Sequence, residues 1–171
     1  MHRKLGHKMA VTCVISAMTA SAAVADLHVT FVEGAPKDRF EIQNTGPCSI
    51  AGSTLLLDLS DSQGALIFDV SATGAGVEVF QPFELVAGSE ALKTVPVVVD
   101  GQSVLDLRIG ELPPGAEIAF TIDVDDTMGG REITVSGAEI QGAVITLRSD
   151  TQETSGVFSS SAKARVQIEQ C

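Results

Sequence analysis

Three carboxylates lie within four residues of the sequence, at Asp123, Asp125 and Asp126, shortly before the pair Gly129–Gly130. Alternation along an expected strand places Asp123 and Asp125 on its solvent face, and Asp126 begins the turn that follows. Carboxylate oxygens suit Ca²⁺, and carboxylates this close repel each other until a cation joins them. The three residues are therefore candidate Ca²⁺ ligands. The alternative is an acidic, solvated hairpin end in which Asp and Gly only form the turn.

The rest of the chain offers little for covalent catalysis. His28 is the only histidine after residue 25, and a Ser-His-Asp or Cys-His system needs a histidine base. It lies in an expected strand, where an exposed structural role is favoured. The chain has no Trp and no Tyr, although sugar-cleaving clefts usually present aromatic platforms. We therefore expect that the protein is not an enzyme.

The first 25 residues have the layout of a secretory signal peptide. Three basic residues and no acid occur within the first eight positions, an apolar run spans 9–20, and Ala-Val-Ala ends at Ala25. We expect cleavage after Ala25 and a secreted or periplasmic protein. The apolar run is shorter than the ~20 residues that cross a bilayer, so we expect no membrane insertion after cleavage.

Residues 26–171 match the ~150 residues of one domain. The whole chain carries 22 acidic and 11 basic residues, a net charge of −11. A negative surface repels phosphate backbones, so we expect no nucleic-acid partner. The acidic balance suits either a solvated surface or the binding of divalent cations.

The cysteine count predicts one disulfide in the mature chain. Cys13 lies in the expected signal peptide, which leaves Cys48 and Cys171 in the mature chain. In an oxidising compartment such a pair is expected to form one disulfide. Closing so long a loop contributes up to ~4–5 kcal/mol in the chain-entropy model. An intermolecular bond or two free thiols are the alternatives.

The elements that must position these residues are strands. Apolar and polar residues alternate with period two along five clear stretches: Leu27–Phe31, Phe40–Gln43, Leu105–Ile109, Ile118–Val124 and Ala164–Ile168. Turn-forming Gly, Pro, Asn and Asp separate them, and no amphipathic helix is indicated. We predict an all-β domain, an antiparallel β-sandwich of Ig-like or jelly-roll-like type. The Ser/Thr-rich stretch 149–162 is expected to be a loop.

Several longer segments carry a resemblance to a known family. They are Thr30–Phe40, Gly64–Val70 with Gly74–Glu84, and Thr121–Asp126 with Ile133–Glu139. These segments resemble bacterial proteins named for the core protein of the marine sponge aggregation factor. The similarity runs over most of the mature chain, from about Leu27 to Leu147.

The resemblance implies a non-enzymatic function. The sponge factor is an extracellular, proteoglycan-like assembly that mediates calcium-dependent cell aggregation. It implies Ca²⁺-assisted cell-surface adhesion or self-association here, with a surface protein or glycan as partner. This chain departs from the scaffold in being short and in lacking an N-x-S/T glycosylation site. Two alternatives stay open: a ligand-binding module for a glycan or peptide, and an accessory domain whose edge strands pair with another exported protein.

Overall fold

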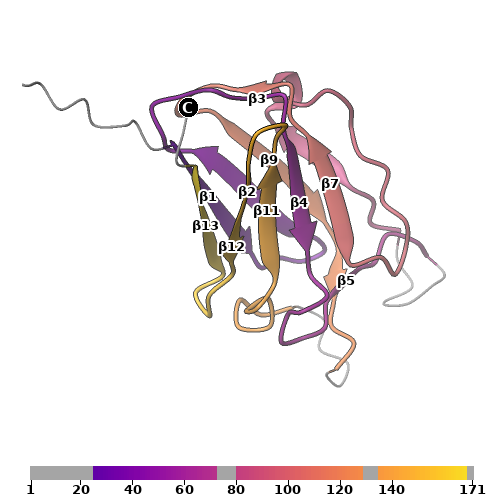
Figure 1. The fold of residues 1–171 in the computed structure, drawn as a ribbon. Coiled ribbons are helices and arrows are strands. Elements are labelled where there is room, and N and C mark those ends of the chain that lie inside the picture. Colours follow the sequence, from indigo (N-terminus) through magenta and orange to yellow (C-terminus); the bar gives the residue numbers. More distant parts are fainter. Residues whose placement is uncertain (1–24, 73–79, 129–134, 169–171) are drawn as a thin grey trace, which may run out of the picture.

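The computed structural model describes residues 25–72, 80–128 and 135–168 (Figure 1). Within these ranges the chain forms thirteen strands and one short 3₁₀ helix, η1 (Ser89–Ala91). The strand pairings described there are all antiparallel. The all-β, antiparallel class predicted from the alternation is confirmed. The expected signal peptide falls almost wholly outside the described residues.

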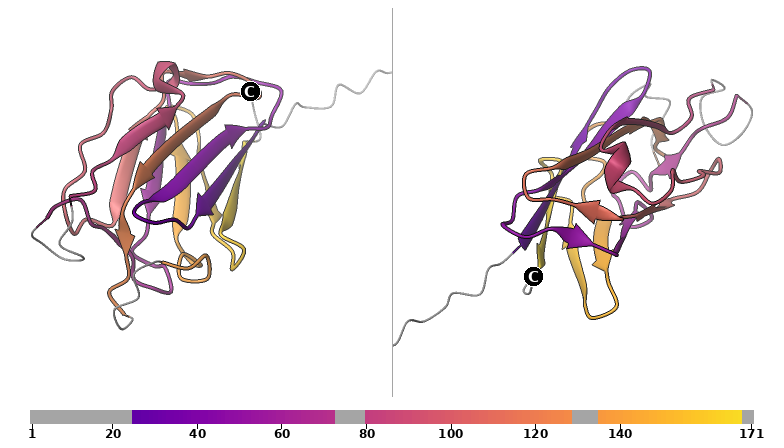
Figure 2. Two further views of the ribbon diagram at one scale, coloured as in Figure 1. Left: turned by 180° about the vertical axis from the view of Figure 1, so that it is seen from behind. Right: turned by 90° about the horizontal axis from the view of Figure 1, so that it is seen from above.

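The strands form two larger sheets and two short pairs. The five-stranded sheet has the order β13 (Lys163–Ile168), β1 (Ala25–Val32), β2 (Asp38–Asn44), β9 (Glu117–Ile122) and β6 (Glu84–Ala87). The four-stranded sheet has the order β12 (Glu153–Val157), β11 (Val144–Arg148), β4 (Thr54–Asp58) and β7 (Val104–Arg108). The short pairs are β10 (Val124–Asp125) with β5 (Ile67–Phe68), and β3 (Ile50–Ala51) with β8 (Glu111–Leu112). Seen from behind, β1, β2 and β9 lie in front of the four-stranded sheet (Figure 2).

Both larger sheets contribute side chains to one hydrophobic core. In β7, Leu105 and Leu107 are buried between exposed neighbours, and β13 alternates in the same way. Successive side chains of a strand point to opposite faces, so a period-two sequence produces this burial directly. Within the described ranges, no helix has the length and apolar character needed to span a bilayer.

Phenylalanine rings form a ladder across the five-stranded sheet. Phe31 lies opposite Phe40, and Phe40 lies opposite Phe120, on three neighbouring strands. The ring centroids of Phe40 and Phe120 are 5.1 Å apart, and Phe83 stacks on Phe120 at 4.8 Å. A one-residue slip would move these rings to the opposite face, so the ladder helps to fix the register.

The last two strands connect the two sheets. β12 belongs to the four-stranded sheet and β13 to the five-stranded sheet, and the two run side by side in Figure 1. A side chain at Gly156 would place its Cβ 2.2 Å from the main-chain oxygen of Arg165, so only glycine allows this approach. The expectation of a loop over 149–162 is wrong, because Glu153–Val157 form β12.

The predicted disulfide involves one residue that the structure describes. Cys48 lies in the turn after β2 and packs against the core, and its carbonyl accepts a 2.7 Å hydrogen bond from Asn44 Nδ2. Cys171 lies outside the described residues. A hollow of about 230 Å³ is lined by both Cys48 and Ile168, so β13 ends close to Cys48. The Cys48–Cys171 bond stays a prediction, and the position of Ile168 supports it.

Candidate metal centre

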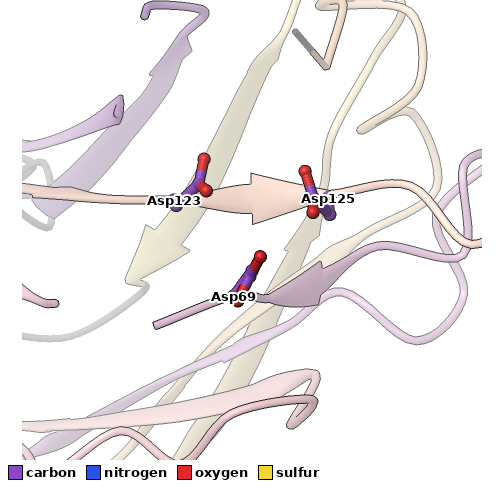
Figure 3. A group of neighbouring side chains, drawn as sticks. All are labelled: Asp69, Asp123 and Asp125. Atoms are coloured by element: carbon purple, nitrogen blue, oxygen red, sulfur yellow. The ribbon is translucent and has the colours of Figure 1, made fainter. Parts of the chain in front are cut away.

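A short strand pair brings three aspartates together. β9 continues through Asp123 into β10, and β10 pairs with β5 so that Val124 lies opposite Phe68. Asp69 follows β5 directly, and its main-chain N–H donates a 3.1 Å hydrogen bond to the carbonyl of Asp123. This register places Asp69 beside Asp123 and Asp125, although it lies far earlier in the chain. Figure 3 shows the side chain of Asp69 pointing between the other two.

The geometry suits one bound cation. Asp69, Asp123 and Asp125 each offer a carboxylate oxygen, and these oxygens lie within 4.8 Å of one another. Ca²⁺–oxygen distances are about 2.3–2.6 Å, so two oxygens on one ion are at most about 5 Å apart. The three carboxylates therefore lie close enough to bind the same ion. A calcium ion takes further oxygens from main-chain carbonyls or water.

Asp69 is the residue whose surroundings call for a cation. Its side chain is only 1 % exposed, and neither carboxylate oxygen accepts a hydrogen bond in the described structure. The neighbouring carboxyl of Asp100 already accepts hydrogen bonds from the main-chain N–H groups of Val70 and Ser71, at 3.0 and 3.1 Å. Two carboxyl groups can share a hydrogen bond only when one is protonated. A buried carboxylate without a donor is strongly unfavourable, so Asp69 needs a proton or a cation.

Asp38 positions this site from the neighbouring strand. It lies at the start of β2, is 2 % exposed, and has its two carboxylate oxygens bonded to main-chain N–H groups. One bond, of 3.0 Å, comes from Gly34, and the other, of 3.2 Å, comes from Val124 in β10. The second bond fixes β10, which contains Asp125 and directly follows Asp123. We therefore assign Asp38 a positioning role.

Burial and mutual repulsion raise the pKa values of three of these groups. Burial raises the pKa of Asp69 to about 7, and Asp100 and Asp125 add to the rise. Burial also raises the pKa of Asp38 to about 7, with the charge of Asp123 adding and the Gly34 N–H opposing. The pKa of Asp123 rises to about 6 through burial and then through the charge of Asp125. A cation bound at this site would therefore compete with protons near neutral pH.

The sequence-predicted ligands are brought together only in part. Asp123 and Asp125 both belong to the cluster, whereas Asp126, the third predicted ligand, is not among the three converging carboxylates. Asp69 was missed by the sequence analysis, and so was Asp38. One signal was available for Asp69, since it is a lone acid within the apolar stretch Leu66–Val70. Charged residues are rarely buried without a partner, so such an acid is a candidate ligand.

Comparison of this chain with protein-family models, with curated proteins and with solved structures finds no match in any of the three. The resemblance to aggregation-factor core proteins, and the function that it implies, stay predictions.

Without a divalent cation, the free energy of unfolding is expected to fall by a few kcal/mol as the pH rises from about 4 to about 7, because Asp38 and Asp69 ionise. Both carboxyl groups have folded-state pKa values of about 7 against an ordinary value of 3.8. Over this interval the folded state binds more protons than the unfolded state, so stability falls as the pH rises. Urea denaturation in EDTA at about pH 5 and about pH 8 measures the change.

The Asp69→Asn variant isolates the contribution of one carboxyl group. Its stability relative to the natural chain should be more favourable at the higher pH, because the amide cannot ionise. A relative stability that does not change with pH would show that Asp69 titrates alike in the folded and unfolded states, which would contradict the prediction.

Proposed function

We propose that this chain is an exported, non-enzymatic β-sandwich domain that binds Ca²⁺ through Asp69, Asp123 and Asp125. In this proposal the cation assists cell-surface adhesion or self-association. The observation that carries it is the buried carboxylate of Asp69, which has no hydrogen-bond donor and lies within reach of two further carboxylates. A cation supplies the charge that this arrangement lacks.

The proposal includes a β-sandwich, in which the two larger sheets pack face to face. Its support is a five-stranded and a four-stranded antiparallel sheet whose inward side chains belong to one core. In a sandwich the inner faces of two sheets interdigitate while their outer faces stay polar. β7 and β13, one from each sheet, both show this alternation of buried and exposed side chains. Two antiparallel sheets of five and four strands are compatible with a sandwich of Ig-like or jelly-roll-like type.

The position of His28 supports a non-enzymatic function. His28 is exposed in the middle of β1, opposite Gln43 of β2 and Arg165 of β13. It lines an open hollow of about 410 Å³ on the outer face of the five-stranded sheet, together with polar residues of neighbouring strands. His28 is thus an exposed residue on the outer face of the sheet, which suits a structural role.

In this proposal the bound cation favours association by reducing electrostatic repulsion between the associating surfaces. The whole chain has a net charge of −11, so two copies, or a copy and an anionic surface, repel each other. A divalent ion at the aspartate cluster removes two units of that charge and holds β5 and β10 together. Both effects favour contact between surfaces near the site.

Light scattering coupled to size-exclusion chromatography tests the proposal on the protein purified after export. We expect the molar mass to increase as Ca²⁺ is titrated into the millimolar range, and to stay at one value for Asp69→Asn. Asp150→Asn is the matched control, since Asp150 is an exposed acid in the turn between β11 and β12 and its variant should behave like the natural chain. A monomer at every Ca²⁺ concentration would contradict self-association, and calorimetry would then show whether Ca²⁺ still binds.

A further inference from the structure

One edge of the four-stranded sheet is unpaired over most of its length. β7 is the last strand of this sheet, and β4 is its one neighbour there. The N–H of Ile109 donates to Ser53 and the N–H of Leu59 donates to Ser103, both at 2.8 Å. In an antiparallel pair only alternate residues bond to the same neighbour. The odd-numbered residues therefore face β4, and Val104, Asp106 and Arg108 direct their main-chain groups outward.

The outward groups of β7 are bonded at the two ends of the strand. The carbonyl of Arg108 accepts a 2.8 Å bond from Lys93 N, and that of Val104 accepts a 2.8 Å bond from Gln102 Nε2. Between them, in the described part of the chain, no hydrogen bond joins the main chain of Asp106 to another residue. The centre of this edge thus presents a main-chain donor and acceptor without partners.

A second unpaired segment lies across a groove from this edge. Leu92 forms an antiparallel bridge with Ile109, after which the chain leaves β7 and returns to it only at Gln102. Within the described ranges, no hydrogen bond is formed by the main chain of residues 94–98. This segment and β7 line a groove of about 390 Å³. The connection from η1 to β7 runs alongside β7 in Figure 1 and in the left view of Figure 2.

The side chains around the groove differ between its two ends. Val95, Val97 and Val104 are exposed at one end, and Val97 is 88 % exposed. Arg108 lines the other end, and Lys93 lies just outside it, with its main-chain N–H bonded to the carbonyl of Arg108. Neither side chain forms an ion pair with another described residue. Unpaired cations beside each other are notable in a chain with a net charge of −11. A ligand that fits this groove is apolar at one end and carries a carboxylate at the other.

We propose that this groove binds an extended segment of another polypeptide, which adds to β7 as a strand. The segment runs antiparallel to β7, with valine-like side chains against Val95, Val97 and Val104 and an acidic side chain near its N-terminal end that pairs with Lys93 and Arg108. Main-chain hydrogen bonds supply affinity in such strand addition, and alternate side chains supply specificity. The inference goes beyond the calcium proposal and does not depend on it.

A second copy of this chain fits the edge less well. Pairing two β7 strands antiparallel about their centre places Asp106 opposite Asp106 of the other copy. Like charges directly opposite each other destabilise a strand pair, and the net charge of both copies opposes their approach.

The test uses a labelled probe peptide, acetyl-Asp-Thr-Val-Thr-Val-Thr-amide, in which Asp and both valines lie on one face of the added strand. It is titrated with the protein and followed by fluorescence anisotropy. We expect saturable binding and roughly a five- to tenfold loss of affinity for Arg108→Glu, which loses a charge-assisted pair. Lys163→Glu makes the same charge change on β13, in the other sheet, and should bind like the natural chain. A peptide with Lys in place of Asp should bind more weakly than the probe.

Asp106→Pro tests the main-chain part of the proposal. Proline removes the outward N–H without removing a hydrogen bond to β4, so the sheet should persist while strand addition is lost. Circular dichroism checks the fold of this variant, and Arg108→Glu serves as the test if it does not fold. Absence of saturable binding to the natural chain, or equal binding by a folded Asp106→Pro variant, would overturn the proposal. A dimer lost in Asp106→Pro, without peptide binding, would also overturn it in favour of a second copy.

Discussion

Ca²⁺ at about a hundred times its dissociation constant is expected to raise the melting temperature of this protein by about 5–10 °C, because binding at that ratio contributes about 2.7 kcal/mol. The cation would offset two of the three negative charges that converge just after β5 and at β10. It would bind the folded state alone, since the strand pairing that brings Asp69 to Asp123 is lost on unfolding. Thermal melting followed by circular dichroism, with Ca²⁺ and with EDTA, measures the shift.

Asp69→Asn is expected to act in opposite directions under the two conditions. With Ca²⁺ the variant should lose most of the stabilisation, because the site loses its central charged ligand. In EDTA it should equal or exceed the natural chain, by up to about 1–3 kcal/mol, because a buried carboxylate without a donor is removed. A variant damaged only in packing would be less stable under both conditions, so the pair of measurements separates the two explanations.

Two further variants define which acids belong to the site. Asp150→Asn should keep the full calcium shift, since that residue is exposed in a distant turn. Asp126→Asn distinguishes the sequence prediction from the structure: a retained shift supports the cluster of Asp69, Asp123 and Asp125. The absence of any shift in the natural chain at millimolar Ca²⁺ would contradict the calcium proposal itself.

Phe120→Ala is expected to lower the free energy of unfolding by about 3–5 kcal/mol, as removal of a buried aromatic ring commonly does. Phe120 is 0 % exposed and contacts the rings of Phe40 and Phe83, with centroids 5.1 and 4.8 Å away. The change would leave a cavity in the hydrophobic core beside β9. Urea denaturation at one fixed Ca²⁺ concentration measures it, and a chain of ordinary stability would be close to unfolding.

Phe80→Ala is the matched control for this substitution. Phe80 is 70 % exposed and precedes β6, so the same change in side chain should alter stability by no more than about 0.5 kcal/mol. Similar losses of unfolding free energy in the two variants would show that a phenylalanine in the ladder of rings stabilises the fold no more than an exposed phenylalanine does. That result would contradict the assignment of Phe120 to the centre of the core.

The period-two pattern predicted most strand faces because burial in a sheet depends on alternation within one stretch of chain. Asp123 and Asp125 could be singled out from the sequence, since they lie two residues apart, Asp125 in β10 and Asp123 directly before it. Asp69 could not, because its proximity depends on the register between β5 and β10, which the local sequence does not determine. Asp38 depends in the same way on the pairing of β2 with β9.

β12 was missed because its sequence lacks an apolar alternation. In Glu153–Val157 the buried residue is Gly156, which has no side chain to produce a pattern. The strand is held by pairing with β11, by a 2.8 Å bond between the hydroxyls of Thr146 and Ser155, and by the ion pair of Arg148 with Glu153. These are tertiary contacts, and they override the turn-like composition of the stretch.

The pairing of β1 with β13 has a consequence for how the chain reaches its fold. These strands lie side by side, and an ion pair joins Arg165 to Asp26, 139 positions earlier. The five-stranded sheet therefore cannot close until the last described strand has been synthesised, and the search for that contact must cross nearly the whole domain. Proteins dominated by such distant contacts fold slowly, on millisecond to second timescales. Until β13 is made, β1 lacks one of its two neighbours, so the edge of β1 stays exposed for most of the synthesis of the chain.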